Sequence, residues 1–139
     1  MKKVITMYTD GGARGNPGPA GIGVVLYNDR KEIVDTIAKY LGEKTNNEAE
    51  YTALLEGVHR ARALGAQVVH CFADSELMVK QLLGDYRVRS PSLARLFTRC
   101  WNALVAFDSW SIAHVPRAKN KAADRLVNQA IDSALYEKS

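Results

Sequence analysis

The sequence has no long apolar run. A membrane-spanning helix needs about 20 consecutive apolar residues, whereas the longest runs here are a few residues long, such as 22–27, which Gly23 interrupts. The first residues include two lysines, but the apolar stretch that follows reaches Asp10 too soon for a secretory signal, and no small-residue cleavage site follows. We therefore expect a cytoplasmic protein that does not interact with membranes.

The sequence also has little that would mark a zinc site or a P-loop. Its two cysteines, Cys71 and Cys100, lie in apolar segments, which predicts buried free thiols, with a disulfide as the alternative. Neither the cysteines nor the three histidines have zinc-ligand spacing. The glycine-rich run 11–21 is not followed by Gly-Lys-Ser/Thr, which a P-loop requires.

Acidic residues are outnumbered, with 15 Asp and Glu against 19 Lys and Arg, a net charge of +4. The excess is concentrated between residues 86 and 125, where eight basic residues stand against Asp108 and Asp124. This distribution suits a polyanionic partner such as a nucleic acid. The alternative is a solvated basic surface.

The hydrophobic pattern predicts an α/β protein. A chain of 139 residues fits a single domain, 1–139, with a sizeable core. We predict a turn-forming run at 11–21, because it is rich in glycine and proline. The expected elements are strands 4–9, 21–27 and 33–40, helix 46–64, strand 67–73, helices 75–83 and 91–107, strand 110–114 and helix 120–135. This order implies a five-stranded mixed sheet of three antiparallel strands and two parallel additions, with helices on both faces.

Four acidic residues stand at positions that a purely structural role does not require. Asp10 and Asp74 each end a predicted strand, where α/β proteins commonly carry function. Glu50 lies four residues before Leu54, on the apolar side of its helix, and a carboxylate there is costly unless it is paired or metal-bound. Asp124 flanks the apolar stripe of the last helix. Taken singly, each could instead form a turn, cap a helix or favour a helix N-terminus.

A cluster of these four carboxylates would be a site for hard divalent cations. Oxygen-only ligands suit Mg²⁺, with Mn²⁺ as a possible substitute. Two such ions about 4 Å apart can activate a water molecule and stabilise a leaving 3′-oxygen in phosphodiester hydrolysis. The residues therefore favour a nuclease.

Four sequence blocks resemble the type I ribonuclease H family in order and spacing, over nearly the whole chain. They are Thr9-Asp10-Gly11-Gly12-Ala13-Arg14-Gly15-Asn16-Pro17-Gly18, Thr45-Asn46-Asn47-Glu48-Ala49-Glu50, Ala73-Asp74-Ser75 and Asn120-Lys121-Ala122-Ala123-Asp124-Arg125-Leu126. The resemblance implies the ribonuclease H-like fold and a monomer that binds RNA–DNA hybrids. It also implies hydrolysis of the RNA strand by two metal ions, which leaves 5′-phosphate and 3′-hydroxyl ends.

The resemblance also assigns roles to individual residues. By motif position Asp10, Glu50, Asp74 and Asp124 are the catalytic metal ligands. Glu48 is not a ligand, because the family's catalytic glutamate is the last residue of the second block and because Glu48 lies off the buried stripe of its helix.

The substrate-binding residues follow in the same way. Asn16, Asn46 and Asn47 match positions that contact the RNA minor groove and its 2′-hydroxyls, and Thr45 and Asn120 match a pocket for a DNA phosphate. Turns and helix caps are the alternative roles for these side chains.

The sequence departs from the better-known family pattern in two places. The segment 84–92 leads directly into the next helix, so the basic protrusion that grips DNA is predicted to be absent, with Arg87, Arg89, Arg95 and Arg99 as a partial substitute. The loop after His114 is short, so the family's mobile histidine is predicted to be absent as well. We hypothesise that Arg117 replaces it.

Two other functions keep part of this pattern. A nuclease with another substrate, double-stranded RNA in particular, would use the same acids. A nucleic-acid-binding module without activity would be expected to lack one of them, and all four are present.

Overall fold

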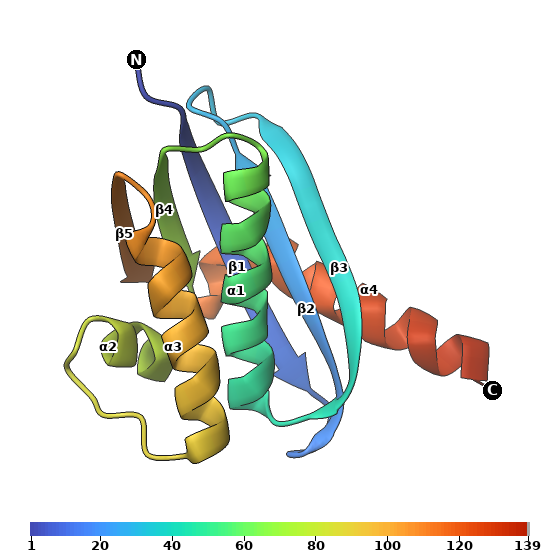
Figure 1. The fold of residues 1–139 in the computed structure, drawn as a ribbon. Coiled ribbons are helices and arrows are strands. Elements are labelled where there is room, and N and C mark those ends of the chain that lie inside the picture. The colour runs from blue at the N-terminus through green and yellow to red at the C-terminus, as the bar shows by residue number, and fades with distance from the viewer. Residues whose placement is uncertain (139) are drawn as a thin grey trace.

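The computed structural model describes residues 1–138 and contains one five-stranded sheet in the order β3-β2-β1-β4-β5 (Figure 1). The strands are β1 (Val4–Ala13), β2 (Gly18–Tyr27), β3 (Ile33–Lys44), β4 (Val68–Ala73) and β5 (Ser109–His114). The helices are α1 (Asn46–Ala63), α2 (Glu76–Leu82), α3 (Pro91–Val105) and α4 (Lys121–Lys138), with a 3₁₀ turn at Arg117–Lys119.

The pairing of the strands confirms the predicted mixed sheet. Strands β1, β2 and β3 are antiparallel neighbours, and β4 and β5 add to β1 in parallel. The prediction of a turn over 11–21 was wrong for most of that run: Gly11 pairs with Ile22 and Gly12 with Gly21, and only residues 14–17 lie between the two strands. Gly11 and Gly21 of this run lie against helices α1 and α4, whereas Gly15, with a positive φ, belongs to the turn itself and Gly18, the first residue of β2, packs against Arg14 of the turn.

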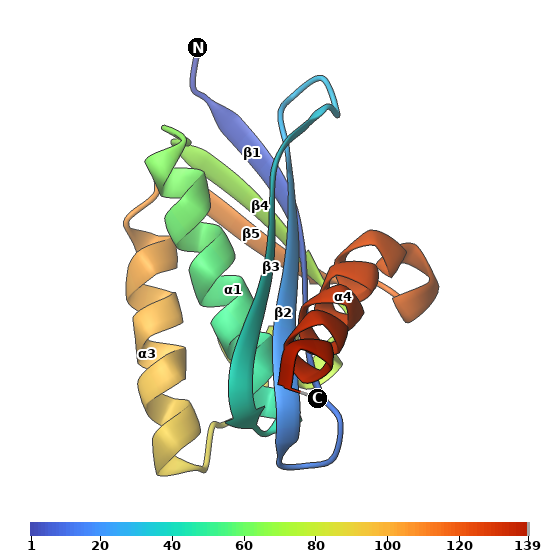
Figure 2. The same ribbon diagram turned by 90° about the vertical axis from the view of Figure 1, so that its right-hand side faces the viewer.

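Helices cover both faces of the sheet. Figure 2 shows α1 and α3 on one side and α4 on the other. The main core lies on the α1 side, where alternate residues of β1 such as Ile5 and Met7 pack with Leu54 of α1 and Leu104 of α3. On the other side α4 packs mainly on β2 and β3, through its buried stripe Ala123, Val127, Ala130 and Ile131.

Two glycines let these helices approach the sheet closely. A side chain at Gly11 of β1 would collide with the backbone of Ala49 in α1, and one at Gly23 of β2 would collide with the carbonyl of Ala123 in α4. In each helix the next residue is an acid, Glu50 or Asp124. Both carboxylates are therefore carried to the sheet by helices that sit unusually near it.

The structure also tests three smaller expectations. Cys71 and Cys100 are buried and free, as predicted. Helix α2 ends at Leu82 and α3 begins at Pro91, and within the described chain no helix lies between them where a protrusion would be. Among residues 1–138, no helix has the length and apolar content needed to cross a bilayer.

Candidate active site

Three of the four acids meet at one end of the sheet. Oxygen atoms of Asp10, Glu50 and Asp74 all lie within 4.8 Å of one another. The parallel register explains two of them, because Thr9 pairs with Ala73 and the next residue on each strand is the aspartate. The parallel pairing thus places Asp10 beside Asp74, which follows the end of β4 as predicted. The prediction that Asp10 also ends its strand was wrong, because β1 continues to Ala13 and Asp10 pairs with Gly23 of β2.

Glu50 comes from α1 and is held in place by the sheet. Its Oε1 accepts a hydrogen bond of 2.8 Å from the backbone N–H of Gly11, and only 9 % of the residue is exposed. Glu48 instead forms a capping box with Thr45: the Thr45 N–H donates to Glu48 Oε1 at 2.9 Å, and the Glu48 N–H donates to Thr45 Oγ1 at 3.2 Å. The choice of Glu50 over Glu48 thus agrees with the geometry.

Asp124 completes the group from the opposite face of the sheet. Its carboxyl group is among the neighbours that raise the pKa of Asp10. Asp10, Glu50 and Asp124 line one cleft of about 340 Å³, whose other polar lining residues are Arg14, Asn46, Asn47, Ser75, Arg117 and Asn128.

The crowded carboxyl groups have perturbed acidities. Burial, followed by the charges of Glu50 and Asp74, raises the pKa of Asp10 far above its ordinary value. Burial and then the charge of Asp74 raise the pKa of Glu50 to about 8, although the Gly11 hydrogen bond and the charge of Arg117 act in the opposite direction. Carboxyl groups with pKa values raised in this way hold their protons at neutral pH unless a cation takes the place of the protons. The donor set of the site, carboxylate oxygens only, fits a hard divalent metal ion.

Asn120 occupies a place that differs from the one expected. The resemblance assigned it a contact with a DNA phosphate, but the residue is only 2 % exposed. Its Nδ2 donates to the Thr9 carbonyl at 2.9 Å and to Asp74 Oδ2 at 3.2 Å. Asn120 therefore joins β1 to the aspartate that follows β4, an arrangement suited to holding Asp74 in place.

The other predicted substrate-binding residues gather at the N-terminus of α1. Asn46 Oδ1 accepts from the Ala13 N–H at 2.8 Å, and the Asn46 N–H donates to Asn16 Oδ1 at 3.0 Å. Asn47 lines the cleft beside Asn46. The side chain of Thr45 caps the N-terminus of α1, which is the alternative role that the sequence offered for it.

Arg117, which we expect to replace the mobile histidine, and His114, which we do not expect to act in that role, lie in different places. Arg117, in the 3₁₀ turn after β5, lines the carboxylate cleft. His114 ends β5 and lines a separate pocket with Glu76 and Lys80 of α2. Of these two residues only Arg117 faces the acids.

Sequence reasoning missed two polar residues of the cleft, Arg14 and Asn128. Arg14 forms an ion pair of 2.7 Å with Asp132, and its guanidinium donates to Asn128 Oδ1 at 3.2 Å. A helical pattern could have found Asn128, which lies one turn after Asp124 on the same face of α4. No signal in the sequence pointed to Arg14 beyond its place in the first motif.

A mixed sheet of this order, with carboxylates from β1, α1, β4 and α4 at one end, defines the class of ribonuclease H-like α/β proteins. The family described as reverse transcriptase-like matches residues 8–130. Ribonuclease HI of Halobacterium salinarum is 44 % identical over 127 residues, which cover 91 % of this chain and 64 % of that protein. The chain thus spans less than two thirds of that relative's length.

Two solved structures are similar over almost their whole lengths. RNase H1 from Halobacterium salinarum NRC-1 has a TM-score of 0.91 and 42 % identity, covering 94 % of this chain and 98 % of the other. LC11-RNase H1, solved in complex with an RNA/DNA hybrid, has a TM-score of 0.89 and 43 % identity, covering 94 % and 99 %. The chain belongs to the type I ribonuclease H family.

Proposed function

We propose that this protein is a metal-dependent endonuclease that hydrolyses the RNA strand of RNA–DNA hybrids and leaves 5′-phosphate and 3′-hydroxyl ends. The observation that carries the proposal is the carboxylate group where β4 ends beside β1, in which oxygens of Asp10, Glu50 and Asp74 lie within 4.8 Å of one another. The similarity to LC11-RNase H1, which binds an RNA/DNA hybrid, supports the choice of substrate.

Asp10, Glu50, Asp74 and Asp124 would hold two Mg²⁺ ions, with Mn²⁺ as a substitute. When bound, the ions supply an activated water molecule and charge stabilisation at the leaving 3′-oxygen. The protein's own contribution is to orient the oxygens: the Gly11 N–H holds Glu50, and Asn120 holds Asp74. Because these contacts fix the side chains beforehand, little reorganisation is needed when substrate binds.

The asparagines at the cleft would provide specificity for RNA. Asn46 and Asn47 line the cleft, and Asn16 is bonded to the backbone of Asn46. Amide side chains can both donate to and accept from a 2′-hydroxyl, the group that separates RNA from DNA. Thr45, beside them, would lie near the DNA strand.

Arg117 would complete the cleft as a mobile cation. Its side chain is exposed, and its charge acts on Glu50. We propose that it neutralises phosphate charge and assists product release, in the place of the family's histidine. Arg95 and Arg99, which line a groove between α1 and α3, would substitute in part for the missing protrusion.

The test is cleavage of three labelled duplexes, an RNA–DNA hybrid, an RNA duplex and a DNA duplex, with Mg²⁺, with Mn²⁺ and with EDTA. We expect the hybrid to be cut, and cutting to stop in EDTA and in Asp10→Asn, whose fold and hybrid binding remain. Full activity of Asp10→Asn would refute the site, and cutting of double-stranded RNA alone would favour the second substrate. Binding of all duplexes without any cleavage would favour the inactive module.

We also propose that the protein acts as a monomer in the cytoplasm. The described residues contain no helix suited to a bilayer, and the carboxylate site draws on one chain only. Light scattering of the purified protein tests whether it is a monomer, and fractionation of the source cells tests whether it is cytoplasmic.

A further inference from the structure

A second pocket lies beside the carboxylate cleft, on the side of the sheet that carries α4. It has a volume of about 500 Å³ and shares no lining residue with the cleft. Its walls come from β1, from β2 with the turn after it, and from the start of α4. They include Thr6, Tyr8, Tyr27, Lys31 and Lys119, which together we call the aromatic pocket.

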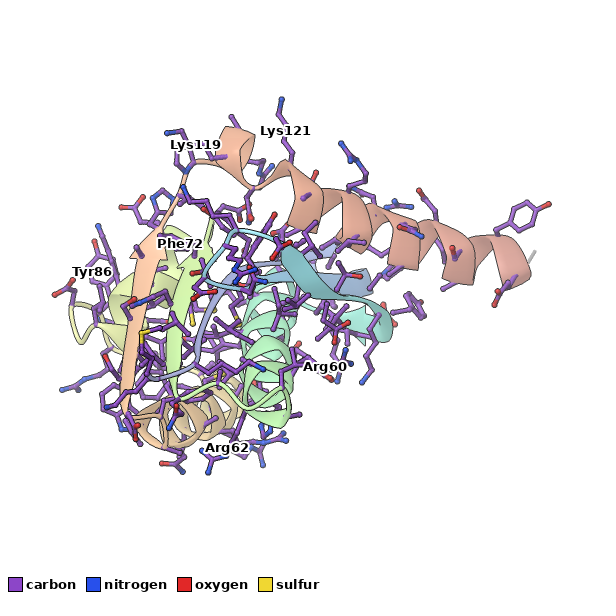
Figure 3. The ribbon with its side chains drawn as sticks, turned by 90° about the horizontal axis from the view of Figure 1, so that it is seen from above. Arg60, Arg62, Phe72, Tyr86, Lys119 and Lys121 are labelled. Carbon is purple, nitrogen blue, oxygen red and sulfur yellow. The ribbon has the colours of Figure 1, made fainter. Side chains whose placement is uncertain are left out.

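The pocket exists because α4 covers only part of its side of the sheet (Figure 2). Side chains alternate along β1, so that Ile5 and Met7 enter the main core while Thr6 and Tyr8 face the other way. Strand β4 alternates in the same manner, with Phe72 on the outward side. In Figure 3 Phe72 and Lys119 are seen on the α4 side of the sheet, opposite Arg62.

Aromatic rings lie in and beside this pocket: Tyr8 and Tyr27 line it, and Phe72 packs against Tyr8 next to it. Tyr8 and Phe72 are paired in register on neighbouring strands, and their rings are stacked with centroids 5.0 Å apart and planes 21° apart. Tyr27 meets Tyr8 edge-on, at 5.9 Å and 81°. All three side chains are partly exposed. An outward sheet surface with aromatic rings on adjacent strands is suited to stacking with unpaired bases.

The charges at the rim favour a nucleic acid. Lys31 and Lys119 line the pocket, and Asp29 is the acid among its lining residues. Lys119 ends the same 3₁₀ turn that begins with Arg117, a residue of the carboxylate cleft. One short basic turn therefore separates the two cavities, and a phosphate chain that leaves the cleft over this turn meets a cation on either side.

We propose that the aromatic pocket binds unpaired nucleotides of the RNA strand where that strand continues beyond the hybrid. The proposal rests on the proposed function, because the acids define which strand enters the cleft. Base stacking on tyrosine does not depend on sequence, so the pocket would favour hybrids with a single-stranded RNA extension over blunt hybrids without selecting a sequence.

The test compares blunt hybrids with hybrids that carry an RNA extension at the 5′ or the 3′ end. Affinity is measured with Mg²⁺ in an Asp10→Asn background, and 2-aminopurine in the extension reports stacking through loss of fluorescence. We expect one of the two extensions to bind about fivefold or more tightly than the blunt hybrid, since a stacked base is worth roughly 1–3 kcal/mol. Tyr8→Ser and Lys119→Glu should each remove that gain and the fluorescence change.

Two controls keep the result clear. Tyr86→Ser removes another exposed aromatic side chain, one that lines a different pocket, and should leave the gain in affinity for the extended hybrid intact. Lys119→Glu changes an exposed side chain and no packing, so its result stands even if Tyr8→Ser is unstable. Equal affinity of the Asp10→Asn protein for blunt and extended hybrids would overturn the proposal. So would equal affinity of the Asp10→Asn protein with and without Lys119→Glu for the extended hybrid.

The experiment also separates this proposal from the proposed function. If neither hybrid is cleaved by the wild-type protein but the extension still binds through Tyr8 and Lys119, the nuclease assignment fails and the pocket remains. If blunt hybrids are cleaved normally and extensions add nothing, the pocket fails and the nuclease remains. A hybrid whose DNA strand carries the extension is the last arm of the test, and tighter binding of that hybrid than of the RNA-extended ones would overturn the assignment of the strand.

Discussion

Glu50→Gln should stabilise the protein when divalent metal is absent. The substitution keeps the size of the side chain and an oxygen that can accept the Gly11 N–H, but it removes a charge that is buried beside Asp10 and Asp74. In the folded protein the pKa of Glu50 rises from 4.5 to about 8. A group with a raised pKa binds its proton more tightly when folded, so its stabilising contribution is complete below about pH 4.5 and is lost as the pH rises towards about pH 8.

The size of this effect follows from the shift. At about 1.4 kcal/mol for each pH unit, the difference between 4.5 and about 8 corresponds to a ceiling of about 5 kcal/mol. The actual difference in stability is smaller than this ceiling. Small movements of the carboxylates and bound counterions raise the effective dielectric constant at the site and so weaken the repulsion. We expect the free energy of unfolding of Glu50→Gln in EDTA to exceed that of the wild type by about 1 to 3 kcal/mol at about pH 8, and to differ little at about pH 5.

The measurement is urea unfolding followed by circular dichroism across this pH range, with EDTA and then with Mg²⁺. Mg²⁺ should stabilise the wild type by mass action and the variant much less. Glu48→Gln is the matched control in the same helix: hydrogen bonds from Thr45 lower the pKa of Glu48, so removing its charge should give no gain at high pH. If Glu50→Gln in EDTA is no more stable than the wild type at about pH 8, the account of repelling buried carboxylates is refuted.

Two further predictions concern the residues around the acids. Asn120→Ala should lower the free energy of unfolding by about 1 to 3 kcal/mol, because the buried carbonyl of Thr9 loses its partner. It should also raise the Mg²⁺ concentration needed for half-maximal cleavage, since Asp74 is no longer held. A normal Mg²⁺ dependence would show that Asn120 does not position Asp74. Arg117→Ala should slow cleavage. It should also shift the acidic limb of the pH–rate profile to higher pH, because the charge of Arg117 lowers the pKa of Glu50. Unchanged activity and an unchanged profile would remove Arg117 from the mechanism.

The sequence by itself determined the order of elements and three of the acids. Alternation in strands and the apolar stripe of α1 are local patterns, and they placed Asp74 at a strand end and Glu50 on a buried helix face. They also placed Asp10 at a strand end, although β1 in fact continues past it to Ala13. The parallel register brings the two aspartates together, since Thr9 pairs with Ala73. Glu48 was set aside from the sequence because of its place in the motif and its position off the buried stripe, and the structure shows it in a capping box with Thr45.

Only the tertiary structure decided how the chain uses its glycines and Asn120. A glycine-rich run reads as a turn, yet Gly11 lies inside a strand, where α1 comes too close for a side chain. Gly23, in a strand that the pattern did predict, leaves the same room for α4. Asn120 reads as a cap or a ligand contact, yet it bonds Thr9 and Asp74, which lie 111 and 46 residues away in the sequence. The aromatic pocket is of the same kind: Tyr8, Tyr27 and Lys119 meet because a helix leaves part of a sheet uncovered. Local periodicity carries no information about contacts between distant segments, and these features consist of such contacts.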